Sequence, residues 1–175
     1  MTLNMPSYAA GDLIIACPIF NVSTYTCTPS QAGWTVVNDD ATNHIKTYYR
    51  IATASEPASY VFTSSVAGRL RGSMSVWRGA SSVSNFVYKT GTAVDAYTPD
   101  DDYIVVAMIH HETITNNNLC SPSYAGWTKE FCVTSGSSYT SGSRLNSSDS
   151  VEKDTEISSW TATPSTSHCV FQINR

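Results

Sequence analysis

The densest group of side chains that could do chemistry is His110-His111-Glu112, where imidazole and carboxylate groups could bind a metal ion or carry protons. Neighbouring residues of a β-strand point to opposite faces of the sheet, so His110 and His111 cannot both ligate one ion in an undistorted strand. A further ligand, His44 or His168, would have to come from a distant part of the chain. We interpret the cluster as polar side chains at a strand end and predict no metal site.

The acidic residues suggest a second kind of site, because calcium prefers several oxygen ligands on one loop. The run Asp100 to Asp102 lacks the spaced D-x-D-x-D-G pattern of a calcium loop, and we interpret it as a polar turn before a strand. Asp39 and Asp40 are likewise predicted to be solvent-facing turn residues. We therefore expect no cofactor.

Catalysis has no sequence signature either. Serine is abundant, but no G-x-S-x-G elbow places a nucleophile, and no pair of carboxylates stands out as a glycosidase pair. We predict that the chain is not an enzyme.

The net charge of −4 lacks the basic excess that nucleic-acid binding needs, and no apolar run approaches the roughly 20 residues of a membrane helix. Neither nucleic acid nor a membrane is an expected partner.

The chain has an odd number of cysteines, scattered singly and without C-x-x-C spacing: Cys17, Cys27, Cys120, Cys132 and Cys169. This pattern favours small buried apolar groups in a reducing cytosol over zinc or redox sites. Cys17 with Cys27, and Cys120 with Cys132, occupy similar places in two repeated segments. A disulfide within each half is therefore the less favoured alternative.

The repeat itself is short: "PSQAGWT" begins at Pro29 and "PSYAGWT" at Pro122, with six of seven letters shared. Each phrase follows a compact apolar run, "DLIIACPIF" from Asp12 and "DYIVVAMIH" from Asp102, which predicts a strand buried on both faces. Pro18 cannot donate to a ladder, so we expect a bulge there or a sheet edge beyond it. The structural core residues that this pattern predicts are Gly33, Gly126, Trp34 and Trp127, with the glycines turning the chain so that the indoles point inward.

Further strands are expected at residues 46–53, 59–64, 70–79, 85–90 and 167–175, and residues 134–150 are expected to form a long hairpin or loop. The last strand should close the second repeat as residues 73–79 close the first. No window has helical spacing with caps. The prediction is an all-β fold with little or no helix: a two-sheet, jelly-roll-like β-sandwich with an internal duplication. One domain over 1–175 is expected, with repeat halves at about 10–90 and 100–175.

Tyrosines in or beside the expected loops could stack on sugar rings or anchor a protein interface: Tyr8, Tyr25, Tyr97, Tyr124 and Tyr139. Either use is compatible with the sequence. A tyrosine that packs on its own loop is an equally simple interpretation.

Four pieces of the first half, "AAGDLIIA", "AGWTVV", "YYRIATASEPASYVFT" and "GSMSVWRGA", resemble a β-sandwich module of tailed-bacteriophage virion proteins. Members typically read G-D-L-L-I-A, then G-W-T, then Y-Y-K-x-A-T-A-x-E-P-A-x-Y-x-F, then a strand ending Y-R-G. The similarity is close over residues 10–79 and loose beyond.

The resemblance implies a structural virion protein. Because the chain begins just before the first strand and ends just after the last, we expect a free-standing capsid decoration or cement protein. It would be made in the host cytoplasm and bind the outer head surface. The implied partners are the major capsid protein and further copies of the chain, with a homotrimer expected because capsids offer three-fold sites. The candidate interface residues are Arg69, Arg71, Arg78, Arg144, Tyr97 and Tyr124.

The alternative that stays open is a glycan- or receptor-binding module of a head or tail fibre, with host-surface glycans as the ligand. A decoration protein should occur at high copy number and need no sugar. A glycan binder should retain host cells or polysaccharide by itself.

Overall fold

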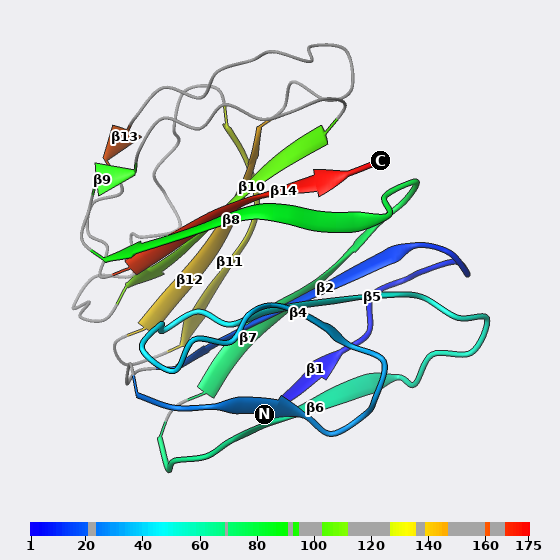
Figure 1. The fold of residues 1–175 in the computed structure, drawn as a ribbon, viewed down its shortest axis with the longest axis horizontal. Coiled ribbons are helices and arrows are strands. Elements are labelled where there is room, and N and C mark those ends of the chain that lie inside the picture. Colours follow the sequence, from blue (N-terminus) through cyan, green and yellow to red (C-terminus); the bar gives the residue numbers. More distant parts are fainter. Residues whose placement is uncertain are drawn as a thin grey trace. The chain divides into compact units, whose positions relative to one another are not determined.

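The computed structural model describes residues 1–20, 24–68, 70–90, 93–94, 103–111, 127–135, 139–146, 160–161 and 167–175. For Arg71, Val170 and the described residues between 93 and 168, it describes the backbone alone. Every regular element in these ranges is a β-strand, and all described pairings are antiparallel (Figure 1). The all-β prediction is confirmed.

The chain divides into two units, residues 1–83 with Arg175 and residues 84–174. The first unit contains a four-stranded sheet in the order β4 (Thr35–Asn38), β5 (Thr47–Ile51), β2 (Leu13–Phe20) and β7 (Leu70–Trp77). It also contains a three-stranded sheet in the order β1 (Thr2–Asn4), β6 (Ser59–Ser64) and β3 (Cys27–Pro29). The single domain expected over the whole chain stays a prediction.

Both sheets of the first unit contribute to one apolar core. On β6, Tyr60 and Phe62 are fully buried while Val61 between them is exposed, as the two-residue period of a strand requires. The core joins residues of both sheets with one residue from a connecting loop: Leu3, Ala16, Phe20, Tyr25, Cys27, Tyr48, Tyr60 and Phe62. The two sheets are therefore held together by burial of their facing side chains.

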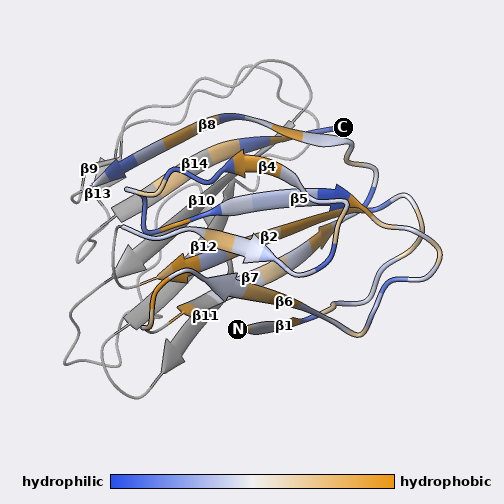
Figure 2. Ribbon diagram, turned by 60° about the horizontal axis from the view of Figure 1, so that its bottom comes forward, coloured by the Kyte–Doolittle hydropathy of each residue, from blue (hydrophilic) through white to orange (hydrophobic). Residues whose placement is uncertain are grey.

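The central strand β2 is buried at every position, as the apolar run predicts, and its residues are mostly coloured as hydrophobic in Figure 2. Pro18 does not bulge the strand, because the pairing with β7 runs from Leu13 to Phe20 without a register shift. On the other side, the Lys46 backbone N–H donates to the Pro18 carbonyl at 2.9 Å. Proline has no N–H to donate back to the Lys46 carbonyl. The strand therefore lacks one hydrogen bond at Pro18, and the expected bulge is absent.

Gly72 lies opposite Pro18 on β7, at a very close approach of the two backbones. A Cβ atom at Gly72 would lie 2.6 Å from the Cys17 carbonyl oxygen and 2.8 Å from the Pro18 Cα. Both atoms belong to the backbone of a buried strand and cannot move aside cheaply. Only glycine fits at this position.

The second unit contains a five-stranded sheet in the order β11 (Trp127–Ser135), β12 (Tyr139–Asn146), β10 (Tyr103–His111), β14 (Ser167–Asn174) and β8 (Ser82–Thr90). A separate two-stranded sheet pairs β13 (Trp160–Thr161) with β9 (Ala93–Val94). The expected hairpin in residues 134–150 is present in its described part, because β11 and β12 pair as far as Ser135 opposite Tyr139.

The strand order of the first unit recurs in the second. The order β4-β5-β2-β7 matches β11-β12-β10-β14, with the Trp-led strand at one edge and the apolar strand in the interior of each sheet. The last strand does pair with β10 as β7 pairs with β2, so that expectation is confirmed. The small sheets also correspond, because β1 pairs with β6 and β9 pairs with β13.

The two Trp-led strands share a local irregularity as well. The β4/β5 pairing shifts register between Val36 and Asn38, and the β11/β12 pairing shifts between Lys129 and Phe131. Counted from the tryptophan of each repeated phrase, these are the same positions. A bulge bends and twists a strand at a fixed place, so its recurrence supports the internal repeat at the level of backbone geometry.

We expect Gly72→Ala to destabilise the protein by about 1–3 kcal/mol, because the added methyl group must push two buried strands apart. Urea unfolding followed by tryptophan fluorescence measures this change. The control is Ser59→Ala, at a half-buried position of β6. It should shift the free energy of unfolding by less than about 0.5 kcal/mol. Equal stability of Gly72→Ala and wild type would contradict the close approach.

Candidate functional site

The repeated phrase leads into β4 through a left-handed glycine. Gly33 has φ +92°, a conformation that favours glycine, and Trp34 follows it immediately. Trp34 is partly buried against the core of the first unit, as expected. In the second half, Trp127 begins β11 with only its backbone described, and Gly126 lies outside the described residues.

The indole of Trp34 packs edge-on against two core rings. Its ring centroid lies 5.0 Å from that of Tyr60 and 5.6 Å from that of Phe62. The guanidinium of Arg50, on β5, lies 5.7 Å from the Trp34 ring centroid and 5.3 Å from that of Tyr60. Edge-to-face and cation–π contacts of this kind favour one arrangement of the rings over other packings.

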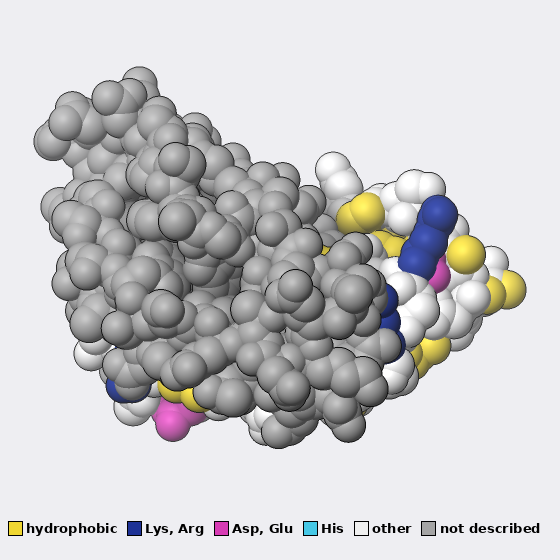
Figure 3. Space-filling view, turned by 90° about the horizontal axis from the view of Figure 1, so that it is seen from above, with side chains coloured by type: hydrophobic (Ala, Val, Ile, Leu, Met, Phe, Trp, Pro, Cys, Tyr) yellow, Lys and Arg dark blue, Asp and Glu magenta, His cyan; other side chains and the backbone are white. Residues whose placement is uncertain are grey.

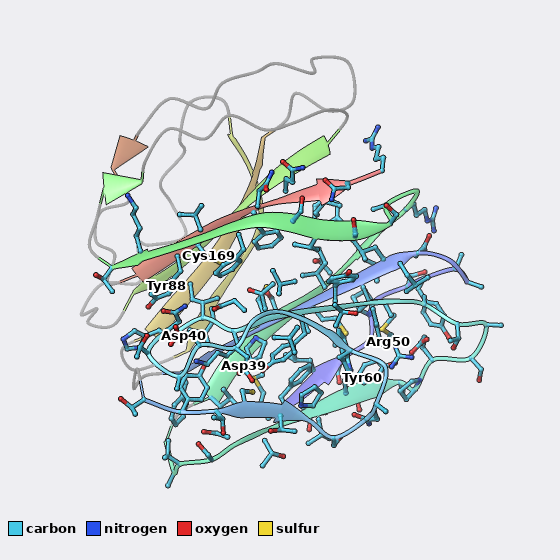
Figure 4. The ribbon with its side chains drawn as sticks, in the orientation of Figure 1. Asp39, Asp40, Arg50, Tyr60, Tyr88 and Cys169 are labelled. Atoms are coloured by element: carbon cyan, nitrogen blue, oxygen red, sulfur yellow. The ribbon has the colours of Figure 1, made fainter. Side chains whose placement is uncertain are left out.

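Arg50 also forms a buried ion pair with Glu56. The Nη2 and Oε1 atoms are 3.4 Å apart, and the two side chains are 14% and 1% exposed. Glu56 Oε1 accepts from the Thr53 backbone N–H at 2.6 Å and from its hydroxyl at 2.8 Å, and Oε2 accepts from the Tyr60 hydroxyl. The carboxylate is thus satisfied by several donors, as burial of a charge requires (Figure 4 labels Arg50 and Tyr60).

Two further contacts connect this pair to the surrounding loops. Arg50 Nη1 donates to the Ala32 carbonyl at 3.2 Å, just before Gly33. The Glu56 backbone N–H donates to the Tyr8 hydroxyl at 2.7 Å. We call Trp34, Arg50, Glu56 and Tyr60 the Trp34 cluster. It ties three loops of the first unit together.

The Trp34 cluster coincides with the letters that carry the family resemblance. The tryptophan belongs to "AGWTVV", and the other three members belong to "YYRIATASEPASYVFT". Sequence analysis singled out Trp34 but missed Arg50, Glu56 and Tyr60 as a set. The available signal was that Arg50 and Glu56 are the two charged residues of this motif. Where such a motif is buried, its basic and acidic side chains must pair.

A second buried polar group lies on the loop immediately before β5. Lys46 is fully buried, donates from Nζ to the Asp40 carbonyl, and lies with Nζ 4.3 Å from the centroid of the Tyr25 ring. Burial lowers the pKa of Lys46, and the nearby Asp39 and Asp40 carboxylates oppose that shift. The amine is enclosed by protein, so it is unsuited to attack a substrate.

The Tyr48 hydroxyl hydrogen-bonds Asp39 Oδ1 at 2.9 Å and the Cys27 carbonyl. Burial, and then the hydrogen bond to Asp39, raise the pKa of Tyr48. Asp39 is therefore half-buried and engaged, so its prediction as a solvent-facing residue is wrong. Asp40 is exposed as expected, and hydrogen bonds from Thr42 lower the pKa of its carboxyl (Figure 4 labels both aspartates).

Cys17 and Cys27 are free thiols and buried, and the Cys169 side chain is buried as well. A disulfide between Cys17 and Cys27, the alternative weighed from the sequence, is thus excluded, and Cys120 lies outside the described residues. Burial raises the pKa of both Cys17 and Cys27 to about 12. The thiolate is the reactive form, so these thiols are inert at neutral pH.

The loop tyrosines that can be placed are not free sugar platforms. Tyr25 is 2% exposed and donates to the His44 carbonyl at 2.9 Å, so the interpretation of a packed tyrosine holds there and the sugar-stacking one does not. Tyr8 is half-buried and bound to Glu56. Tyr97 and Tyr124 lie outside the described residues, and only the backbone of Tyr139 is described.

The histidine and aspartate candidates form no metal centre in the described part of the chain. His44 Nδ1 lies 3.0 Å from the Phe20 carbonyl oxygen. Among the described residues, no three potential ligands gather at one point. His110 and His111 occupy the last two positions of β10, where the described backbone places them opposite Ser141 and Thr140 of β12.

Of the candidate interface residues, Arg78 is the one whose side chain is described. It is 77% exposed, with Nε 3.9 Å from Asp12 Oδ2. Arg69 lies outside the described residues, and the side chains of Arg71 and Arg144 are not described. On the face in Figure 3, the coloured side chains show apolar groups beside single basic and acidic ones.

Comparison of the chain with protein-family models, curated proteins and solved structures found no match. No described segment forms a helix long and apolar enough to cross a bilayer. The described part of the chain is thus an all-β protein, in which the Trp34 cluster joins aromatic and charged side chains of the first unit. The resemblance to the phage module stays an expectation.

We expect Arg50→Leu to destabilise the protein by about 3–5 kcal/mol, because it leaves the buried Glu56 carboxylate without its cation. In a double-mutant cycle with Glu56→Gln, the two losses should be clearly less than additive. Chemical denaturation gives all four stabilities.

Arg78→Leu is the matched control, since it removes an exposed arginine that also faces a carboxylate. It should change the free energy of unfolding by no more than about 1 kcal/mol. Similar losses for Arg50→Leu and Arg78→Leu, or additivity in the cycle, would refute the buried pair.

The buried thiols predict that stability decreases as the pH rises above 9. Burial raises the pKa of the Cys17 thiol from 9.0 to about 12. As the pH rises, the thiol of the unfolded chain therefore loses its proton first, and alkali favours the unfolded state. Between pH 8 and pH 10, one such thiol removes about 1 kcal/mol of stability. Tyr48 acts in the same direction above pH 10 and Lys46 in the opposite direction.

The comparison with Cys17→Ala isolates the contribution of this thiol. Wild type should lose about 1 kcal/mol more than the variant between pH 8 and pH 10, in urea unfolding under reducing conditions. If the free energies of unfolding of the two proteins changed in parallel with pH, Cys17 would have the same pKa in the folded and unfolded states, and the prediction would be wrong.

Proposed function

We propose that the chain is a structural protein of a tailed-bacteriophage virion, a capsid decoration or cement protein that binds the outer head surface. Its partners in this role are the major capsid protein and further copies of itself. Its part in the virion is to add contacts across capsomer boundaries, and it catalyses no reaction.

The observation that carries the proposal is the Trp34 cluster. The residues that make the chain resemble the phage module are the residues that contact one another in the core, with ring centroids of Trp34 and Tyr60 5.0 Å apart and an Arg50–Glu56 ion pair of 3.4 Å. A motif of this kind specifies a fold and not an active site. The similarity therefore has a physical basis and supports a shared module.

The repeated sheet order also fits an adhesive role. Two sheets with the same strand order and the same bulge give a single chain two related β frameworks. A protein that binds only the assembled head stabilises that head by mass action, and no reaction centre is needed for it. Inert buried thiols and an enclosed lysine agree with such a passive part.

The described surface offers exposed groups for such contacts. Arg78 is largely exposed, and Val36 on the edge strand β4 is 55% exposed. Arginine and apolar side chains are suited to anchor an interface whose remainder is polar and wet. Tyr25 is buried and cannot serve the glycan-binding alternative as a stacking platform. That alternative is kept as one outcome of the experiment below.

The test is to delete the gene from the phage that encodes this chain, and then to add purified protein back to the mature heads. We expect binding that saturates at a copy number proportional to capsomers, and heads that withstand a higher temperature before releasing DNA. Cryo-electron microscopy of the restored particle should place the chain on the outer head surface.

Isolated capsid protein that has not assembled is the control and should bind weakly, because the site is formed by neighbouring capsomers. Location at a tail tip, or retention of host cells and polysaccharide by the purified chain, would replace the decoration function with the glycan-binding one.

A further inference from the structure

Two buried N–H groups of the Trp34 cluster have no acceptor among the described residues: Trp34 Nε1 and Arg50 Nε. Nearly all buried polar groups in folded proteins are hydrogen-bonded. Leaving one such donor without an acceptor costs about 1–3 kcal/mol. Two of them in a single cluster, on side chains whose rings and charge are otherwise well packed, point to a shared acceptor.

The charge of the cluster limits what this acceptor is. Arg50 already faces Glu56 at 3.4 Å, and the Glu56 side chain is 1% exposed. A second anion would add negative charge to a neutralised buried pair, at a large desolvation cost. The acceptor is therefore uncharged.

The burial of the cluster limits its size. Both donor nitrogens are buried, and the Arg50 side chain is only 14% exposed. A sugar or peptide group would need an open approach to these atoms. A water molecule needs a cavity of about one probe sphere and two to four polar partners.

From these limits we propose that the Trp34 cluster binds one structural water molecule, whose oxygen accepts from Trp34 Nε1 and from Arg50 Nε. The Ala32 carbonyl already accepts from Arg50 Nη1 at 3.2 Å and has a second lone pair. It is the acceptor that we expect for one hydrogen of the water. This water would join the repeated Ala-Gly-Trp-Thr turn to β5.

The test uses nuclear magnetic resonance on the full-length protein labelled with ¹⁵N. The Trp34 indole N–H should show a cross-peak to water whose sign indicates a residence time longer than molecular tumbling. Trp77 is the internal control, because its Nε1 donates directly to the Ser75 hydroxyl at 2.8 Å. Its indole should show no such long-lived water.

Arg50→Lys removes the Nε donor and keeps a cation for Glu56, so it tests the site without abolishing the charge pair. We expect the Trp34 water cross-peak to be lost, and the indole hydrogen to exchange with solvent at least tenfold faster, in a protein that stays folded. A folded wild type without the cross-peak would overturn the proposal. So would Arg50→Lys with an unchanged cross-peak and exchange rate, because Arg50 would then take no part in holding the water.

Discussion

The buried ion pair between Arg50 and Glu56 is the interaction on which the first unit depends. A charge inside a protein must be paired and hydrogen-bonded, and here the pair takes its further partners from Ala32, Thr53 and Tyr60. Those partners lie on the turn before β4, on the β5–β6 loop and on β6. The pair therefore connects a strand of one sheet to a strand of the other, and Trp34 packs against Arg50 and Tyr60 at the same place.

The strand β2 imposes a second constraint, because it is buried at every position between β5 and β7. Pro18 in its middle removes one hydrogen bond on the β5 side, where the Lys46 backbone N–H still reaches the Pro18 carbonyl. Gly72 allows the β7 side to approach without a clash. A residue that usually marks an edge is thus accommodated in a central strand by one glycine across the ladder.

The two units show how a short repeated phrase can reflect a longer structural one. Only Ala-Gly-Trp-Thr and the apolar strand before it are conspicuous in the letters, yet strand order, the position of the bulge and the β1/β6 and β9/β13 pairings all correspond. Many apolar residues satisfy the same pleated position, so two segments can share a backbone arrangement while few of their letters agree.

The sequence by itself determined the all-β class, the two apolar central strands, the closing strand of each half and the inward Trp34, because alternation and turn residues act locally. It did not determine the state of Pro18, the engagement of Asp39 or the burial of Tyr25. Nor did it bring Arg50, Glu56 and Tyr60 together with Trp34. Those outcomes depend on how strands and loops pack against one another: Gly72 meets Pro18 from a strand far along the chain, and Tyr48 meets Asp39 across the connection between β4 and β5. Only the packing of one sheet against the other decides which polar side chain meets which, since burial makes each of them find a partner.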